Sequence, residues 1–149
     1  MIYSPIFYTG NKTKLIKKGL IDLFPKNIDK FIDVFTGSGV VALNTKANEY
    51  ILNDINPYVI ELLQMFLKHE PQDIIKNIEL IIDKFQLEYG IDDNNSFNSR
   101  SKKFNKEIYE IHKENYTKLR NYYNTNKNTL FLYVLLIYSF SRQMRFSNK

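Results

Sequence analysis

The sequence predicts an α/β protein in which a small parallel α/β portion precedes an all-helical segment. Short apolar runs alternate with helical periodicities up to about residue 68, a glycine-rich turn joins the first run to a helix, and only helical periodicity follows residue 70. The 149 residues suffice for one domain, yet they contain only two convincing strand patterns. We therefore expect a partial α/β unit at residues 1–68 with an all-helical segment, inserted or appended, at residues 69–149.

The first half alternates helix and strand in the order that produces parallel pairing. We expect a helix over residues 12–24, a strand over residues 31–35, a helix after Gly39 to about Asn48, a strand over residues 50–53 and a helix to about Lys68. Asn56 is expected to cap the last of these helices, with Pro57 as its first residue. A helix between two strands requires a crossover, which predicts that the two strands run parallel.

The second half shows helical periodicity alone. One apolar face comprises Ile74, Ile75, Ile78, Ile81, Ile82 and Phe85, a second comprises Phe104, Ile108, Ile111, Leu119 and Tyr122, and a last helix covers about residues 128–142. Between the first two faces, residues 89–101 are polar and rich in Asn and Ser, which predicts a loop.

Charge is unevenly distributed. The net charge is +5, of which residues 1–60 contribute +2, residues 61–93 contribute −5 and residues 94–149 contribute +8, with all four arginines in the last third. This concentration favours a polyanion such as duplex DNA as a partner, and Arg142, Arg145 and Lys149 are the candidate phosphate contacts. A solvated helix face is the alternative that charge alone leaves open.

Several classes of protein are excluded by what the sequence lacks. The absence of Cys excludes disulfide scaffolds, thiol nucleophiles and cysteine-ligated metals, and two distant histidines, His69 and His112, predict no metal site. The longest apolar run, residues 130–140, is too short to span a bilayer. Residues 1–30 contain no signal-peptide pattern, so we expect a cytoplasmic protein without a membrane partner.

The segment Gly37-Ser-Gly39, with Ala42 three residues later, has the G-x-G-x-x-A spacing of a nucleotide-binding turn. Asp54 ends the second strand, where a carboxylate can accept hydrogen bonds from ribose hydroxyls. A tight turn beside an acidic strand cap is the alternative. A dinucleotide such as NAD would need a second βαβ half, which residues 70–149 lack. S-adenosylmethionine is favoured by this absence, by Phe35 in the turn and by the basic segment before the first strand.

Three ordered motifs then point to a known family. They are Phe7-Tyr-Thr-Gly-Asn-Lys12, Phe31-Ile-Asp-Val-Phe-Thr-Gly-Ser-Gly39 and Leu52-Asn-Asp-Ile-Asn56. Together they resemble the Dam-type, D12-class DNA adenine-N6 methyltransferases over residues 3–63, and the resemblance resumes at residues 131–133 and 145–146. It implies a partial Rossmann-like unit that binds S-adenosylmethionine, joined at residues 69–149 to the start of a DNA target-recognition region.

The resemblance also implies roles for individual residues. Lys12 would face the carboxylate of the cofactor's methionine moiety, Asp33 its amino group and Asp54 the ribose, while Phe35 could pack on the adenine. The complete implied set of cofactor residues is Tyr8, Gly10, Lys12, Asp33, Phe35, Gly37, Gly39 and Asp54.

One motif of that family is missing from this sequence. Its members hold a flipped-out adenine with an Asp, Asn or Ser that precedes Pro-Pro-Tyr or Pro-Pro-Phe, and the four prolines here are all isolated. The segments Ser4-Pro-Ile-Phe7 and Asn56-Pro-Tyr58 come nearest, and we interpret both as structural. No catalytic residue is therefore assigned, and we expect an N-terminal fragment or truncated form that is inactive alone. The alternatives are a non-catalytic cofactor- or DNA-binding remnant and one part of a split enzyme whose second chain carries the catalytic half.

Overall fold

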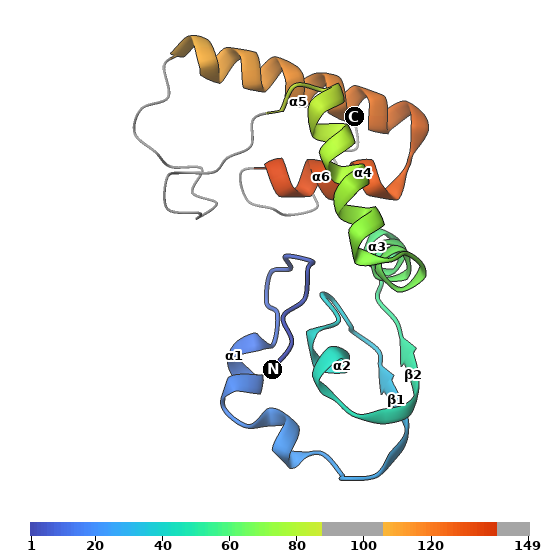
Figure 1. The fold of residues 1–149 in the computed structure, drawn as a ribbon. Coiled ribbons are helices and arrows are strands. Elements are labelled where there is room, and N and C mark those ends of the chain that lie inside the picture. The colour runs from blue at the N-terminus through green and yellow to red at the C-terminus, as the bar shows by residue number, and fades with distance from the viewer. Residues whose placement is uncertain (88–105, 140–149) are drawn as a thin grey trace. The chain divides into compact units, whose positions relative to one another are not determined.

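A computed structural model describes residues 1–87 and 106–139 (Figure 1). These residues fall into two compact units, Met1–Lys68 and His69–Ser139. Fully buried apolar side chains occur in both units: Val59 and Leu62 in the first, and Leu119 and Val134 in the second. The predicted loop at residues 89–101 lies outside the described residues.

The first unit contains two strands among short helices. Its elements are α1 (Thr13–Lys17), the 3₁₀ helix η1 (Leu20–Leu23), β1 (Ile28–Asp33), α2 (Val40–Asn44), β2 (Ala47–Leu52) and α3 (Pro57–Lys68). β1 and β2 pair in parallel, as the sequence predicted, in a register that matches Ile28 with Ala47 and Asp33 with Leu52. The described part of the chain is therefore a mixed α/β structure with one two-stranded parallel sheet.

One face of this sheet carries aromatic contacts with other segments of the first unit, although Tyr50 on this face is 43% exposed. Phe31 and Tyr50 are register partners with ring centroids 6.2 Å apart, and the Phe24 ring lies 6.0 Å from that of Phe31. The hydroxyl of Tyr50 donates a 2.7 Å hydrogen bond to the carbonyl of Thr45, at the end of α2. The other face carries the salt bridge between Lys30 and Glu49, at 3.1 Å, and the partners Ile32 and Ile51.

Two predicted helices were wrong in extent. The helix expected over residues 12–24 is divided into α1 and η1 because Gly19 adopts φ +90°, which a right-handed helix cannot accommodate. The helix expected to reach Asn48 ends at Asn44, and β2 already begins at Ala47. By contrast, α3 begins at Pro57 and ends at Lys68 as predicted, and the Asn56 side chain accepts the Tyr58 N–H at 3.2 Å.

Residues 2–8, the N-terminal strap, are bound to α2 and to the turn before it. The N–H of Ile2 donates to the side-chain oxygen of Asn44 at 2.7 Å, and the Asn44 amide donates to the Ile2 carbonyl at 2.8 Å. The Ser4 hydroxyl donates to the Ser38 carbonyl at 2.5 Å, and the Ile6 side chain is buried. The strap therefore forms part of the wall around the glycine-rich turn.

The second unit consists of α4 (Pro71–Lys84), α5 (Lys106–Asn126) and α6 (Thr129–Tyr138), with α6 packed against both α4 and α5. The predicted apolar faces are confirmed at Ile74, Ile81, Ile82 and Leu119, which are buried, whereas Ile75 and Ile111 are more than half exposed. The Asn128 side chain caps α6 by accepting the Leu130 N–H at 2.9 Å. The end predicted for this helix, near residue 142, lies outside the described residues.

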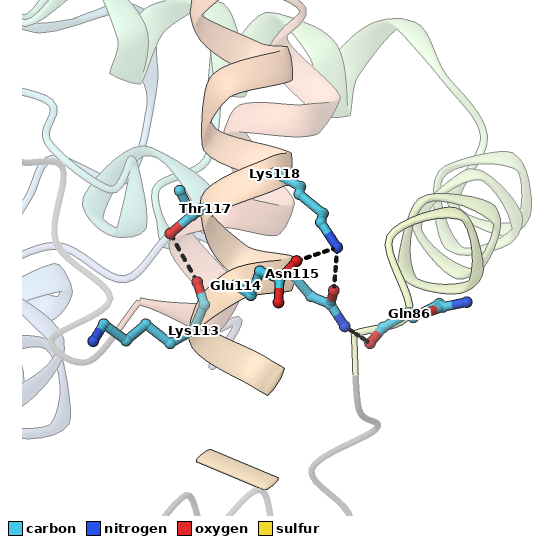
Figure 2. Close-up of polar contacts among 6 residues, drawn as sticks. All are labelled: Gln86, Lys113, Glu114, Asn115, Thr117 and Lys118. Atoms are coloured by element: carbon cyan, nitrogen blue, oxygen red, sulfur yellow. Dashed lines mark hydrogen bonds and ion pairs between the residues drawn. The ribbon is translucent and has the colours of Figure 1, made fainter. Parts of the chain in front are cut away.

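A buried polar contact joins the end of α4 to α5 (Figure 2). Asn115 is 5% exposed, and its amide donates a 3.0 Å hydrogen bond to the carbonyl of Gln86, a residue with φ +50° just beyond α4. Lys118 lies beside it, with its ammonium 2.8 Å from the Glu114 carboxylate and 3.4 Å from the Asn115 side-chain oxygen. No helix in the described residues is long and apolar enough to cross a membrane.

Candidate functional site

The glycine-rich turn begins at the carboxyl end of β1, where it continues the strand pairing. The N–H of Asn53 donates to the Asp33 carbonyl at 2.8 Å, and the N–H of Thr36 donates to the Asn53 carbonyl at 2.9 Å. A hydrogen bond of 2.8 Å from the Gly39 N–H to the Thr36 carbonyl then closes the turn. In parallel α/β sheets, ligands bind beyond this carboxyl edge.

Asp54 is held directly against the turn. One of its carboxylate oxygens accepts the N–H of Gly37 at 2.8 Å, and the other accepts the N–H of Asn56 at 2.9 Å. A carboxylate has about four acceptor sites, so these two bonds leave about two for further donors. The structure thus brings the predicted acid and the predicted glycine turn together, and Asp54 both fixes the turn and retains capacity to bind hydroxyl groups.

Both glycines of the turn have a steric as well as a conformational reason to lack a side chain. Gly37 has φ +47° and Gly39 has φ +72°. A Cβ at Gly37 would lie 3.0 Å from the Tyr8 ring, and a Cβ at Gly39 would lie 3.0 Å from a methyl group of Leu63. Tyr8 therefore packs over Gly37, so the strap and the turn meet at this point.

The other predicted cofactor residues have no comparable contact with Gly37 or Asp54 among the interactions described. The ammonium of Lys12 donates to the carbonyl of Gly10 at 3.2 Å, which is a contact within its own turn. Gly10 has φ +77° with open space where a Cβ would lie. Asp33 ends β1 and is half-buried, whereas the Phe35 side chain is 85% exposed. Tyr8, Gly37 and Asp54 thus form the connected centre of the predicted set.

Two further residues belong to this surface and were missed in the sequence. Thr36 is 5% exposed, and its hydroxyl is buried without a hydrogen-bond partner in the described structure. Ile55 directly follows Asp54 and is 94% exposed. A buried hydroxyl without a partner costs about 1–3 kcal/mol. Ile55 could have been found in the sequence as an apolar residue next to the acid. Thr36 could not, because the burial of its hydroxyl is visible only in the folded turn.

The two segments nearest to a catalytic motif have structural roles. The Ser4 hydroxyl is engaged with the Ser38 carbonyl and also accepts the N–H of Ile6 at 3.1 Å. The Asn56 side chain caps α3. Within the described residues, no cluster of His, Asp or Glu is suited to bind a metal ion.

The proposed DNA contacts, Arg142, Arg145 and Lys149, lie outside the described residues. Residues 106–139 contain five basic and three acidic side chains, and two of these lysines pair with glutamates of α5. Lys113 lies 3.4 Å from Glu110, and Lys118 lowers the pKa of Glu114 through a hydrogen bond and its charge. The strongly basic character of the last third therefore comes from residues 94–105 and 140–149, each with three basic and no acidic residues.

Comparison with known proteins identifies the family. Residues 8–145 match the D12 class of N6 adenine-specific DNA methyltransferases. The chain belongs to this family. Members of the D12 class use S-adenosylmethionine and act in DNA methylation, and the match extends well beyond the segment in which the sequence motifs lie.

Similar proteins include restriction-modification methyltransferases from three bacteria. The chain is 38% identical over 147 residues to the type II methyltransferase M.FokI of Planomicrobium okeanokoites and 36% identical over 147 residues to the modification methylase StsI of Streptococcus sanguinis. It is 32% identical over 146 residues to the modification methylase LlaI of Lactococcus lactis subsp. lactis. These matches cover 97–99% of this chain but only 19–20% of each relative, so the chain spans about a fifth of their length.

Proposed function

We propose that this chain is the cofactor-binding portion of an adenine-N6 DNA methyltransferase and that it holds S-adenosylmethionine beyond the carboxyl edge of β1 and β2. The hydrogen bond between Asp54 and the Gly37 N–H carries the proposal, because it fixes an acid with spare acceptor sites beside a positive-φ turn at that edge. The membership in the D12 class supplies the identity of the ligand.

The chemistry of the surrounding residues fits this ligand. Asp54 would accept hydrogen bonds from the ribose hydroxyls, and the buried Thr36 hydroxyl offers a polar group that lacks a partner within the described residues. Asp33 would bind the methionine ammonium and Lys12 its carboxylate. The exposed side chains of Phe35, in the turn after β1, and of Ile55, directly after Asp54, would cover an adenine ring. When bound, the cofactor supplies an electrophilic methyl group on a sulfonium.

The residues of this chain orient a methyl donor but provide no group to hold the methyl acceptor. Ser4 and Asn56 are engaged in structural hydrogen bonds, and the sequence contains no Pro-Pro pair. A donor without an oriented acceptor gives little rate acceleration. We therefore propose that the activity belongs to an intact enzyme, formed with residues beyond these 149 or with a second chain, in which residues 69–149 begin the DNA-recognition region. A non-catalytic cofactor- or DNA-binding remnant is the competing proposal.

Isothermal titration calorimetry with S-adenosylhomocysteine tests the cofactor site. Asp54→Asn should weaken binding by roughly 10- to 100-fold, because hydrogen bonds to a charged group contribute about 1.5–3 kcal/mol. Asp22→Asn, which removes an exposed acid of η1, is the matched control and should bind like wild type. Equal affinity in wild type and Asp54→Asn, or a preference for NAD, would contradict the assignment.

A methyl-transfer assay tests the proposal that the activity belongs to an intact enzyme. The wild-type chain alone should transfer no labelled methyl group to duplex DNA. The remnant proposal predicts in addition that no added polypeptide restores this transfer.

A further inference from the structure

The positive charge of the first unit is concentrated near the start of the chain. Residues 1–21 contain four lysines and no acidic residue, whereas residues 22–68 contain four lysines and six acidic residues. The side chains of the first segment therefore carry a net charge of +4, and those of the second a net charge of −2. All four lysines of the first segment are exposed: Lys12, Lys14, Lys17 and Lys18.

Three of these lysines share one face of α1. Lys17 lies three residues after Lys14, and Lys18, the residue at the end of the helix, lies four after it. Residues at these spacings are neighbours on a helix surface, and like charges there destabilise the helix. None of the three pairs with a carboxylate in residues 1–87 or 106–139. We call Lys14, Lys17 and Lys18 the α1 lysine face.

Lys12 is not part of this face, because its ammonium is bound to the Gly10 carbonyl and its predicted role lies with the cofactor.

The α1 lysine face is attached to the elements that surround the candidate cofactor site. The ammonium of Lys17 lies 5.6 Å from the centre of the Tyr3 ring, which belongs to the strap. α1 also contacts α2, the helix that follows the glycine-rich turn (Figure 1). Because the strap is bound to the same turn through Ser4 and Ser38, the three cations lie in the unit that contains Asp54 and Gly37.

The charge pattern favours an anionic partner over a face that only keeps the protein in solution. A surface of the second kind mixes both signs, as the side chains of residues 22–68 do. Three like charges on one turn of helix are unfavourable in the chain alone, and an anion that binds them relieves their mutual repulsion.

Among anionic partners, duplex DNA is the one that membership in the D12 class supports. An enzyme that methylates a flipped-out base must bring that base to its cofactor, so the phosphates beside the target nucleotide come to the unit that binds the cofactor. The described helices of the second unit provide few unpaired cations for this purpose, since Lys113 and Lys118 pair with glutamates.

We infer that the α1 lysine face binds the phosphate backbone of duplex DNA beside the target nucleotide. Phosphate contacts fix the position of a protein on the duplex and carry no sequence information directly. The α1 lysine face therefore orients the duplex at the first unit, and the reading of bases belongs to other residues. The inference rests on the proposed function, since it takes DNA as the substrate of the intact enzyme.

Fluorescence anisotropy with a labelled duplex and the full 149-residue chain tests the inference over a series of salt concentrations. Neutralisation of three phosphates contributes about −2.7 to the slope of log affinity against log salt. Substitution of the α1 lysine face by Gln should therefore make this slope shallower by about two to three units, whereas substitution by Arg, which keeps the charge, should preserve it. The matched control removes the same charge from three exposed lysines elsewhere in residues 1–68 and should leave the slope almost unchanged: Lys26→Gln, Lys46→Gln and Lys68→Gln.

Calorimetry with S-adenosylhomocysteine separates failure of this inference from failure of the cofactor proposal. A Gln triple variant that binds S-adenosylhomocysteine like wild type and has the shallower slope supports the α1 lysine face with its fold intact. If its slope and DNA affinity equal those of wild type, the inference is overturned whatever the cofactor affinity. Should the triple variant not fold, Lys14→Gln alone must reduce the slope by about one unit.

Three other results would also overturn the inference. An equal change of slope in the matched control would show that only the net charge matters. A loss of slope in the Arg triple variant would show that the substitutions act through the fold of α1. Binding of the wild-type chain to phosphatidylserine vesicles without binding to duplex DNA would show that the α1 lysine face serves a different anion.

Discussion

Gly37 is the residue at which the strap, the turn and the acid meet. Its N–H is bound by Asp54, its φ is +47°, and its missing Cβ makes room for the Tyr8 ring. Gly37→Ala should lower the free energy of unfolding by about 2–4 kcal/mol, of which about 1–2 kcal/mol is the cost of a left-handed conformation for a residue with a Cβ. Urea denaturation followed by circular dichroism measures the change.

Gly10 provides the matched control for this prediction, because it has φ +77° but open space around a Cβ. Gly10→Ala should cost only the backbone strain. Gly37→Ala should lower the free energy of unfolding more than Gly10→Ala does, and adding Tyr8→Ala to Gly37→Ala should remove this difference. Equal losses of stability in Gly37→Ala and Gly10→Ala would show that the Tyr8 contact imposes no steric constraint.

The sequence predicted the centre of the candidate site from residue types whose roles are local. Glycines at G-x-G spacing indicated a tight nucleotide-binding turn, and the end of a strand pattern placed Asp54 near it. The bond between Asp54 and Gly37 depends on parallel register, and the burial of the Thr36 hydroxyl depends on packing from several segments, so neither is visible in a local pattern. The assignment of these residues to a cofactor stays a prediction.

At the scale of elements, the sequence predicted which helices and strands exist better than where they end. The periodicity of residues 12–24 continues across Gly19, and only the positive φ of that glycine reveals the break. α2 ends at Asn44, whose side chain binds the strap, and the Thr45 carbonyl that follows is bound by Tyr50 of β2. The strap contact joins residues 42 apart in the chain, and the Tyr50 bond joins β2 to the end of α2. The start of α3, in contrast, is fixed locally by Asn56 and Pro57 and was predicted correctly.

The contact between α4 and α5 yields a prediction at this scale. Asn115→Ala should lower the free energy of unfolding by about 1–3 kcal/mol, because it removes the buried donor that binds the Gln86 carbonyl. Asn121→Ala is the control on the exposed side of the same helix and should change stability by less than about 0.5 kcal/mol. Thermal unfolding monitored by helical circular dichroism measures both. Equal effects would mean that the hydrogen bond from Asn115 to Gln86 adds nothing to stability.

For the whole molecule, the net charge of +5 is concentrated in few places. Residues 1–68 carry eight basic and six acidic side chains, the described residues of the second unit balance, and residues 140–149 carry three basic side chains and no acid. The net charge of +8 for residues 94–149 is larger than the unpaired positive charge of the helices in this segment, because Lys113 and Lys118 are paired with glutamates. We therefore expect DNA binding to depend on a small number of cations.

Salt titration of duplex DNA binding tests this expectation. The logarithm of the affinity should fall linearly with the logarithm of salt concentration, and Arg142→Ala with Arg145→Ala should reduce the slope by about two units if each arginine neutralises one phosphate. Lys113→Ala with Lys118→Ala, which removes the same charge from ion-paired positions, should leave the slope almost unchanged. Fluorescence anisotropy with two unrelated duplexes should show little sequence preference. An affinity independent of salt would contradict a phosphate-binding role for the C-terminal arginines.

The separation in sequence between the strap, the turn and Asp54 affects how this chain is made. Ser4 bonds to Ser38, Ile2 bonds to Asn44 and Gly37 bonds to Asp54, so the strap has no partner in the turn until residues 37–38 have been synthesised, and the turn lacks its bond to Asp54 for 17 residues after Gly37. At about 5–20 residues per second, the second interval lasts roughly 1–3 s on the ribosome. Ile6, the one buried side chain of the strap, belongs to the segment that waits for these partners. The strap and the turn therefore complete their contacts only after β2 has been synthesised.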